Sequence, residues 1–520
     1  MFELILHGGS VIDGSGAPSR RADVGVQGGT ITAIGDLSEA QAHQRIDATG
    51  RVIAPGFIDV HNHSDGWLLK LPHLVAKTSQ GFTTEVIASD GISYAPLTPE
   101  LAADWLFYLR PLNGLRISDY DGWRSIADYM SRLDRRNVQN AATLIPYANL
   151  RVLACGWGRA PVDDTQINLM RREAEKGMEE GAVGLSTGLD YIAQCFSTTD
   201  EIARVTESIA PHGVYVTHVR YKEGTLRGIQ EAVEIGRRAG VPVHISHLKA
   251  YSPSETDTIL SYVDKVAVNE VDFTFDIYPY IPGSSLLAML LPYEVWENGP
   301  LAAPARLREP VIRERLEGQL AGGRYDLERI TIAWTASRDS VKWRGRTLAD
   351  YVRESGKPRA DALCELLLDE HFAVTMVLDA GDDRQVEPFL KHPKQMTASD
   401  GIYFVDGTIH PRVYGTATRT LGPMVRDRKL YSLEEAVYKL SGYPAARFGL
   451  TDRGLIREQF AADLVVFDPA TVTDRATYER PHQLSAGVDL VIVGGRVVMA
   501  HGKPVALGDG ELPGRSLCRG

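Results

Sequence analysis

The sequence contains few cysteines and no paired cysteine motif. Its four cysteines, Cys155, Cys195, Cys364 and Cys518, are far apart in a chain of 520 residues. A disulfide framework and a thiolate zinc site both need cysteines at closer spacings, so we expect neither. For Cys195 we favour a buried, inert thiol, with a reactive thiol as the alternative.

Long apolar runs and an excess of basic charge are also absent. No segment approaches the roughly 18 uninterrupted apolar residues that a membrane span needs. Residues 1–6 carry an acid where a secretory signal would be basic. Acidic residues outnumber basic ones by 67 to 56, which gives a formal net charge of −11. These features favour a cytoplasmic protein without a nucleic-acid or membrane partner.

Both ends of the chain are predicted to be rich in β-strands. The first 55 residues alternate short apolar runs with glycine turns such as Gly8-Gly9, and the same texture returns at residues 462–467 and 489–493. The chain is also longer than one hydrophobic core usually supports. We therefore predict a small β-sandwich formed by residues 1–55 and 455–520, around a large domain at residues 56–454.

Strand-like and helical segments alternate through the middle of the chain. Residues 168–181 have the pattern of an amphipathic helix, and residues 182–186 follow as a strand. This alternation, without a Gly-x-Gly-x-x-Gly turn, favours a (β/α)₈ barrel over an open doubly wound sheet. The eight predicted barrel strands are residues 57–63, 83–90, 141–147, 182–186, 214–218, 243–247, 273–278 and 396–400.

The gap between the last two predicted strands is too long for one helical connection. It contains a proline-rich piece at residues 292–310, a strand at 330–334 and a helix at 360–370. We predict an inserted subdomain, approximately at residues 283–345, that could cover the barrel mouth. The predicted fold class is therefore α/β: a TIM-like barrel with an inserted lid and a terminal β-sandwich.

Two histidines, His61 and His63, end the first predicted barrel strand. A β-strand points residues i and i+2 to the same side, so both imidazoles would face one metal ion. An exposed His-x-His loop is the alternative for an isolated pair. Ligand-capable residues at the ends of later strands favour the metal site, because a parallel barrel collects its catalytic groups there. These residues are Asp90, His218, His247 and Asp400.

Six candidate ligands are enough for two ions. Nitrogen and oxygen ligands without thiolate suit Zn²⁺ and are compatible with Mn²⁺, Co²⁺ or Fe²⁺. A divalent ion would lower the pKa of water and supply hydroxide near neutral pH, which indicates a metallohydrolase. The predicted assignment is His61, His63 and Asp400 around one ion, His218 and His247 around the other, and Asp90 on either ion or on both.

Amide hydrolysis also needs a proton shuttle. An amide anion is too basic to leave unprotonated, so a carboxylate must take the proton of the attacking water and deliver it to the leaving amine. Asp400 is the best candidate for this role. The alternative is that Asp400 only caps a turn in Ser399-Asp-Gly401.

Several motifs surround these residues. They are Ala54-Pro-Gly-Phe-Ile-Asp-Val-His-Asn-His63, Gly184-Leu-Ser-Thr-Gly-Leu-Asp-Tyr191, Thr217-His-Val-Arg220, His244-Ile-Ser-His-Leu-Lys249, Asp276-Ile-Tyr-Pro-Tyr280, Ser399-Asp-Gly401 and His410-Pro-Arg-Val-Tyr-Gly415. Together they resemble the amidohydrolase superfamily and, within it, the N-acyl-D-amino-acid deacylases, also called D-aminoacylases. The resemblance covers nearly the whole chain.

The resemblance implies a metal-containing barrel with a composite β-sandwich and an inserted lid. It also implies removal of an acyl group from a D-amino acid, a small molecule that carries a carboxylate. Such a carboxylate needs a cation beside the acidic ligands, which Lys249 and Arg412 could supply unless they are surface salt-bridge residues. At the matching positions, the implied substrate contacts are Tyr191, Lys249, Tyr280, Ser284 and Arg412.

The chain departs from the family's usual pattern at two positions. Ser89-Asp-Gly91 stands where the family has Asn-Cys-Gly with a cysteine ligand, so the preferred metal and the number of ions stay open. Pro146-Tyr147 replaces a Gly-His pair, which predicts a changed pocket near that strand. In addition, Gly184-Leu-Ser186 offers no lysine for the carbamylated bridge that other members of the superfamily use.

Other functions remain as alternatives. Hydantoinases and dihydropyrimidinases commonly use that bridging lysine, which demotes, without excluding, a hydrolase of cyclic or other carboxylated amides. A non-catalytic scaffold relative is the third interpretation, and six competent ligands disfavour it. The acyl group, the accepted chirality and the oligomeric state, including a homo-oligomer, stay open.

Overall fold

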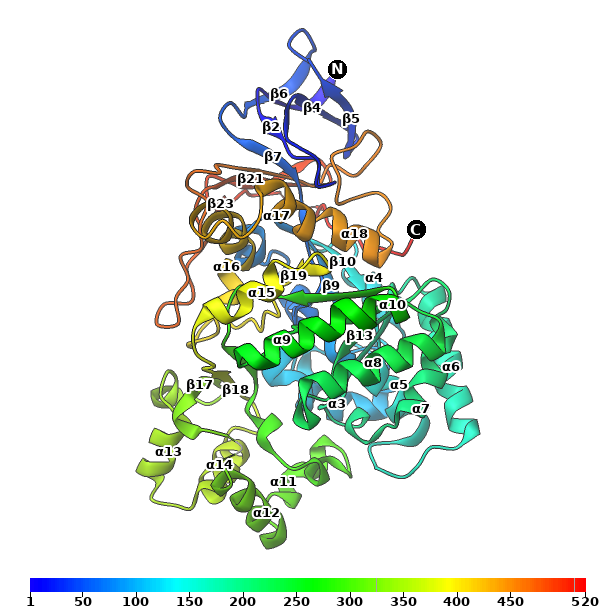
Figure 1. The fold of residues 1–520 in the computed structure, drawn as a ribbon, viewed down its shortest axis with the longest axis vertical. Helices are drawn as coiled ribbons and strands as arrows, with labels where there is room; N and C mark the ends of the chain where they lie inside the picture. Colours follow the sequence, from blue (N-terminus) through cyan, green and yellow to red (C-terminus); the bar gives the residue numbers. More distant parts are fainter. Residues whose placement is uncertain (324, 509) are drawn as a thin grey trace.

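Eight parallel strands form the centre of the computed structural model, which describes residues 1–323, 325–508 and 510–520 (Figure 1). Each predicted barrel strand is present, and several end before the candidate ligand that follows them. The strands are β8 (Phe57–Asp59), β9 (Phe82–Ile87), β10 (Asn140–Thr143) continued by β11 (Ile145–Pro146), β12 (Gly184–Gly188), β13 (Val214–His218), β14 (Val243–Ile245), β15 (Phe273–Ile277) and β19 (Gln395–Thr397).

The strands close into a ring. β8, β9 and β10 pair in parallel, and β11, β12, β13, β14, β15 and β19 pair in chain order. Only Leu144 separates β10 from β11. The ring closes where Asn62 bridges Gly401 in parallel and the Asp400 N–H donates to the His61 carbonyl at 2.7 Å. This closure brings the first strand's histidines beside Asp400, which is more than 300 residues later in the sequence.

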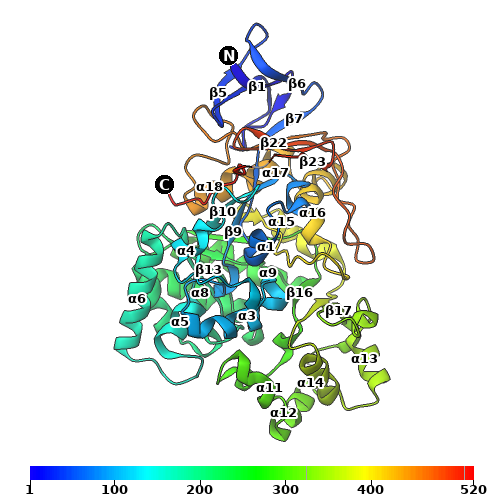
Figure 2. The same cartoon turned by 180° about the vertical axis from the view of Figure 1, so that it is seen from behind.

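Helices connect the strands and cover the outside of the ring (Figures 1 and 2). α6 (Asp164–Glu179) begins after Asp163, whose side chain accepts from the Gln166 N–H, and it buries its apolar face. α8 (Thr225–Ala239) ends at Gly240, where φ is 69°. The other helices around the barrel are α1 (Asp65–Lys70), α2 (Val75–Thr78), α3 (Pro99–Asn113), α4 (Ile126–Ser131), α5 (Tyr147–Cys155), α7 (Thr199–Thr206), α9 (Pro253–Tyr262), α10 (Val268–Glu270), α15 (Glu387–Leu390), α16 (Arg412–Arg419), α17 (Leu433–Leu440) and α18 (Gly442–Phe448).

Strands from both ends of the chain form further sheets at one end of the molecule (Figure 1). One sheet has the order β5-β4-β1-β6, and the other has the order β23-β22-β21-β20-β7-β2-β3. Leu6 and Val24 from the first sheet share an apolar core with Ile53 and Val466 from the second, which is a sandwich arrangement. Their strands are β1 (Phe2–His7), β2 (Ser10–Val11), β3 (Arg20–Arg21), β4 (Asp23–Gln27), β5 (Thr30–Gly35), β6 (Ala42–Asp47), β7 (Val52–Pro55), β20 (Leu464–Phe467), β21 (Val488–Val493), β22 (Arg496–Ala500) and β23 (Lys503–Pro504).

An antiparallel sheet with several helices lies between β15 and β19, outside the barrel. Most of it is at the end of the molecule opposite the terminal sheets (Figures 1 and 2). The predicted insertion ended near residue 345, but β18 (Val374–Leu378) is the central strand of this sheet. The sequence of β18 is a short apolar run like those of several barrel strands. Only its pairing with distant strands shows that it belongs to the inserted sheet. Its neighbours are β16 (Gly283–Leu286) and β17 (Ile330–Thr335), with helices α11 (Ala303–Arg306), α12 (Pro310–Ala321), α13 (Leu348–Ser355) and α14 (Arg359–Asp369).

The structure also shows the state of the cysteines and the character of the helices. All four cysteines belong to the described residues and are free thiols. Burial raises the pKa of the Cys195 thiol to about 12, which fits the inert interpretation of this residue. Within the described ranges, no helix combines the length and the apolar character needed to cross a bilayer.

Candidate metal centre

Six side chains that can bind a metal converge at the carboxyl ends of the barrel strands. Parallel strands end on the same face of a barrel, so residues that are distant in sequence meet there. All six side chains are buried, with no more than 9% of any residue exposed. They are His61 and His63 after β8, Asp90 after β9, His218 at the end of β13, His247 after β14 and Asp400 after β19.

Asp90 lies at the middle of this cluster. Its Oδ1 is 3.5 Å from His61 Nε2 and 3.9 Å from His247 Nε2. Its Oδ2 is 3.7 Å from His63 Nε2 and 3.9 Å from His218 Nδ1. A carboxylate that faces four imidazoles can bind or bridge cations, so the aspartate at the family's usual cysteine position is well placed as a ligand.

The ligand atoms form two overlapping groups. Within each group, the atoms lie within 4.8 Å of one another. His61 belongs to both groups, whereas the predicted assignment put it with one ion only. His218 lies beside the second group without belonging to it, with its Nδ1 3.0 Å from His247 Nε2. The groups are His61, His63 and Asp400, and His61, Asp90 and His247.

Three of the candidate ligands have a left-handed backbone conformation. φ is 59° at Asp90, 38° at His247 and 47° at Asp400. Residues with a Cβ rarely adopt positive φ, and such strain persists where surrounding structure holds it, commonly at functional sites. The strained turns therefore mark the strand ends at which the cluster forms.

The cluster has the properties of a divalent cation site. His61 Nε2 and Asp90 Oδ1 are buried and have no hydrogen-bond partner among the described residues, a costly state unless a ligand satisfies them. Burial lowers the pKa of His247 to about 3, which leaves a neutral imidazole with a free lone pair. Burial alone would also lower the pKa of His61, but Asp276, Asp90 and Asp400 outweigh it and raise this pKa to about 10. Nitrogen and oxygen donors in such a negative field suit zinc.

Three of the imidazoles have a partner on their outer nitrogen. Such partners fix the ring orientation of a metal-binding histidine and its tautomer. Sequence reasoning assigned no role to these partners, although an acid inside the buried strand β15 was a signal for Asp276. His218 Nε2 is hydrogen-bonded to Asp190 Oδ2 at 3.4 Å, and His247 Nδ1 to the Tyr221 hydroxyl at 3.2 Å. His61 Nδ1 lies 3.5 Å from Asp276 Oδ2, an ion-pair distance without a hydrogen bond.

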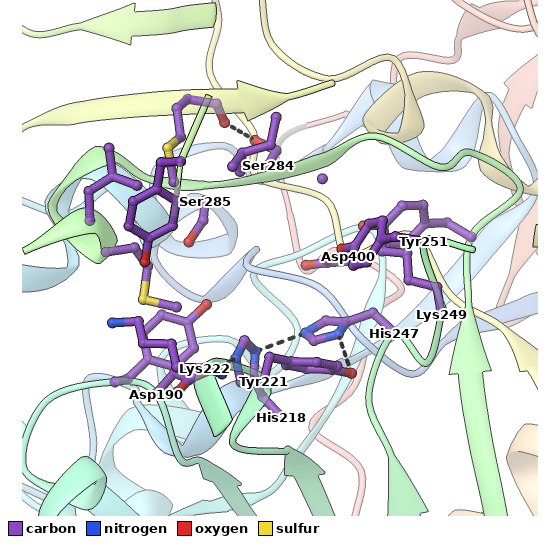
Figure 3. A pocket seen from close by; sticks show the side chains of 18 residues that line it. Asp190, His218, Tyr221, Lys222, His247, Lys249, Tyr251, Ser284, Ser285 and Asp400 are labelled. Carbon is purple, nitrogen blue, oxygen red and sulfur yellow. Dashed lines mark hydrogen bonds and ion pairs between the residues drawn. The ribbon is translucent and has the colours of Figure 1, made fainter. Parts of the chain in front are cut away.

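A cavity of about 460 Å³ opens beside the cluster. Figure 3 shows Ser284 and Ser285 facing His247 and Asp400 across this space. The inserted sheet and the short 3-10 helix η7 (Leu287–Leu290) supply this opposite wall. We call these residues the outer wall: Ser284, Ser285, Met289, Leu290, Met376 and Leu378.

Three of the five predicted substrate contacts line the cavity: Tyr191, Lys249 and Ser284. The Lys249 ammonium donates to the Tyr278 hydroxyl and, at 3.1 Å, to the Ile281 carbonyl. Burial, with a smaller contribution from the Arg412 charge, lowers the pKa of Lys249 to about 7. The Ser284 hydroxyl donates to the Met376 carbonyl at 2.9 Å.

Tyr280 and Arg412 do not belong to this lining. The Tyr280 hydroxyl donates to Asp474 Oδ2 at 3.2 Å. Arg412 is fully buried, and its NH1 lies 2.8 Å from Asp400 Oδ2. Although burial raises the pKa of Asp400, Arg412 together with His61, His63 and His247 outweighs this effect and holds that pKa well below its usual range. Arg412 therefore faces the candidate proton shuttle directly.

Tyr147, which replaces the family's usual histidine, also lies outside the cavity lining. It is buried, and its hydroxyl donates to Glu201 Oε1 at 2.5 Å. Glu201 also accepts from Arg151 at 2.9 Å. Tyr147 therefore takes part in a buried polar cluster with Glu201 and Arg151, outside the cavity lining.

Known proteins resemble this chain over its whole length. A family model described as "Amidohydrolase family" matches residues 44–256 and 386–499, and so leaves out most of the inserted segment. The chain is 37% identical to a D-aminoacylase of Alcaligenes xylosoxydans xylosoxydans over 96% of this chain and 94% of that protein. It is 34% identical to the N-acyl-D-glutamate deacylase of the same organism over 100% of this chain and 97% of that protein. A crystal structure of N-acyl-D-glutamate deacylase from Bordetella bronchiseptica, complexed with zinc and a phosphonate mimic of the tetrahedral intermediate, has a TM-score of 0.84 at 31% identity, with 100% of both chains covered.

Proposed function

This chain belongs to the amidohydrolase family, and from that premise we propose that it removes the acyl group from an N-acyl-D-amino acid. The reaction is a metal-dependent hydrolysis of an amide bond that yields a D-amino acid and a carboxylic acid. One observation carries the proposal: a single cavity joins the ligand cluster to the Lys249 ammonium. A substrate with an amide next to a carboxylate spans such a cavity.

His61, His63, Asp90, His247 and Asp400, with His218 beside them, would hold one or two zinc ions or a related divalent metal. When bound, the metal supplies Lewis acidity that activates water and polarises the amide carbonyl. Asp400 is ionised, because Arg412 stabilises its carboxylate, so its Oδ1 can take a proton. Asp400 lines the cavity, where it can deliver that proton to the nitrogen of the leaving amine.

Lys249 is the candidate partner of the substrate carboxylate. Its ammonium is held by Tyr278, whose ring also packs against the Arg412 guanidinium at 4.4 Å. Lys222 also lines the cavity, but its ammonium packs over the Tyr293 ring at 4.3 Å. A carboxylate at Lys249 would place the adjacent amide towards Asp400 and His247, while Tyr191 and Ser284 offer further hydroxyl groups.

The outer wall favours an apolar group on the substrate. Met289, Leu290, Met376 and Leu378 present thioether and aliphatic side chains to the cavity. An acidic side chain against these residues would lose hydration without gaining a partner. We therefore propose N-acyl derivatives of apolar D-amino acids, in preference to those of D-glutamate or D-aspartate.

The test is an assay of purified protein with matched substrate pairs. N-acetyl-D- and N-acetyl-L-methionine, the corresponding glutamates and a hydantoin are incubated with the protein before chelation, after chelation and after zinc is restored. We expect release of D-methionine only, loss of the activity on chelation and its return with zinc. Release of L-methionine alone, or opening of the hydantoin alone, would contradict the proposal and favour another amidohydrolase activity.

A further inference from the structure

A buried lysine lies beneath the metal-ligand cluster. Lys77 belongs to α2, between β8 and β9, and only 1% of it is exposed. Its ammonium donates to Asp59 Oδ2 and, at 2.6 Å, to Ser399 Oγ. Glu85 Oε2 lies 3.6 Å from the same nitrogen. Burying an ammonium and its carboxylate partners costs desolvation free energy, so we looked for a role of Lys77 at this position.

The three partners of Lys77 lie in, or just after, the strands that carry the ligands. Asp59 ends β8 two residues before His61, and Glu85 lies in β9, which leads to Asp90. Ser399 follows β19 and directly precedes Asp400. These strands come from opposite ends of the barrel sequence, so one ammonium connects the first, second and last strands.

The connection to Asp400 is the tightest. Asp59 Oδ1 accepts from the Ser399 N–H at 2.8 Å, and Ser399 Oγ accepts from the Gly401 N–H at 3.0 Å. The residues on both sides of Asp400 are therefore bound to the Lys77 network. A Cβ at position 401 would lie only 3.3 Å from Lys77 Nζ, so glycine permits this close approach. Asp400 itself has the strained φ of 47° that such surroundings must hold.

Lys77 attracts both carboxylates of the network, and these two carboxylates repel each other. Burial alone would lower the pKa of Lys77, but the carboxylates of Asp59 and Glu85 outweigh it and raise that pKa. Lys77 is therefore a cation whose attraction acts on the strand ends rather than on the cavity. It does not belong to the cavity lining, and so it is not a substrate contact.

We propose that Lys77 is a positioning residue for the hydrolysis, acting through Ser399 on the backbone of Asp400. The expected effect of Lys77 on the rate rests on the proposed function. Its expected effect on the position of Asp400 rests only on contacts within the chain. A shift of a proton shuttle by about 1 Å can reduce a rate by about 10²-fold. Substrate binding, which depends on Lys249 and the outer wall, should change little.

The kinetic test compares Lys77→Met, Ser399→Ala and the matched control Lys439→Met with the unmodified protein. Lys439 is another buried lysine, 2% exposed, which donates to the Leu390 carbonyl at 2.7 Å and is not among the cavity residues. We expect kcat to fall by about 10²-fold in Lys77→Met and about tenfold in Ser399→Ala, with KM within about twofold. Ser399→Ala leaves the buried ion pair intact, so it keeps the test valid if Lys77→Met fails to fold.

A double-mutant cycle separates positioning from a general structural role. If Lys77 and Ser399 act through Asp400, adding Ser399→Ala to Asp400→Asn should lower the residual kcat by less than about twofold. The proposal would be overturned if the fold decreases in kcat of Ser399→Ala and Asp400→Asn multiply fully in the double variant. It would also be overturned if the kcat values of Ser399→Ala and Lys77→Met lie within threefold of that of the unmodified protein.

Crystal structures give a readout that needs no activity. The Ser399→Ala structure should show a displaced Asp400 carboxylate, and Lys439→Met should not. An unmodified protein without deacylase activity would refute the proposed function, whereas an unmoved Asp400 would refute the positioning role.

Discussion

The two sides of the cavity are built in different ways. On one side, the ligand cluster comes from the strand ends of the barrel, where all six ligands are buried and three of them have a strained backbone conformation. On the other side, the outer wall comes from an inserted antiparallel sheet that the family model leaves unmatched. The cluster side carries the charges that the chemistry needs, and the outer wall presents apolar surface. From this difference we expect that the barrel sets the reaction and the insertion sets the choice of substrate.

The largest expected effect is at Asp90, the middle of the ligand cluster. Asp90→Ala should lose bound metal and all measurable activity, because four imidazoles would lose the carboxylate that they share. Asp90→Cys should retain zinc, since thiolate is a good zinc ligand. Metal analysis and an assay with N-acetyl-D-methionine measure both variants. Full metal content and full rate in Asp90→Ala would mean that this residue only forms a turn.

A smaller effect is expected at Asp400, on the same side of the cavity. Asp400→Asn keeps the size of the side chain but removes the base, so kcat should fall by at least about 10²-fold for every substrate alike. The matched control is Asp406→Asn, an exposed aspartate in the following loop that pairs with Arg344, and it should leave kcat unchanged. Near-normal turnover of Asp400→Asn would assign the proton transfer to another group.

The smallest effect is expected at the outer wall, and it should alter selectivity rather than rate. Met289→Arg places a cation on the apolar wall, so the ratio of kcat/KM for N-acetyl-D-glutamate to that for N-acetyl-D-methionine should rise by about tenfold, equivalent to about 1.4 kcal/mol. Met289→Leu preserves volume and serves as the control. An equal loss of kcat for both substrates would show that the insertion takes part in the chemistry, and the contrast between the two sides would fail.

The fold could be predicted well because its signals are local. Most barrel strands are short apolar runs, several of them are followed by a polar residue, and a strand forms at each of the eight predicted places in the described chain. The extent of the insertion could not be predicted. β18 has the same pattern as a barrel strand, and only its pairing with β16 and β17 removes it from the barrel.

The site was predictable to a similar degree. The residues at strand ends were found because a parallel barrel brings those ends together, whatever lies between them in sequence. The side chains that orient them were missed: Asp190, Tyr221 and Asp276 have partners 26 to 215 residues away. No spacing rule connects such pairs, since their contacts arise from the order of strands around the ring.

The sequence by itself determined which residues can bind a metal and at which strand ends they stand, because both depend on residue type and local pattern. Only the tertiary structure decided how those residues are shared and supported. It placed His61 in both ligand groups, directed Arg412 onto Asp400 and brought Lys77 beneath three strands. These arrangements depend on the closure of the ring between Asn62 and Gly401, a contact between distant segments that no local pattern specifies.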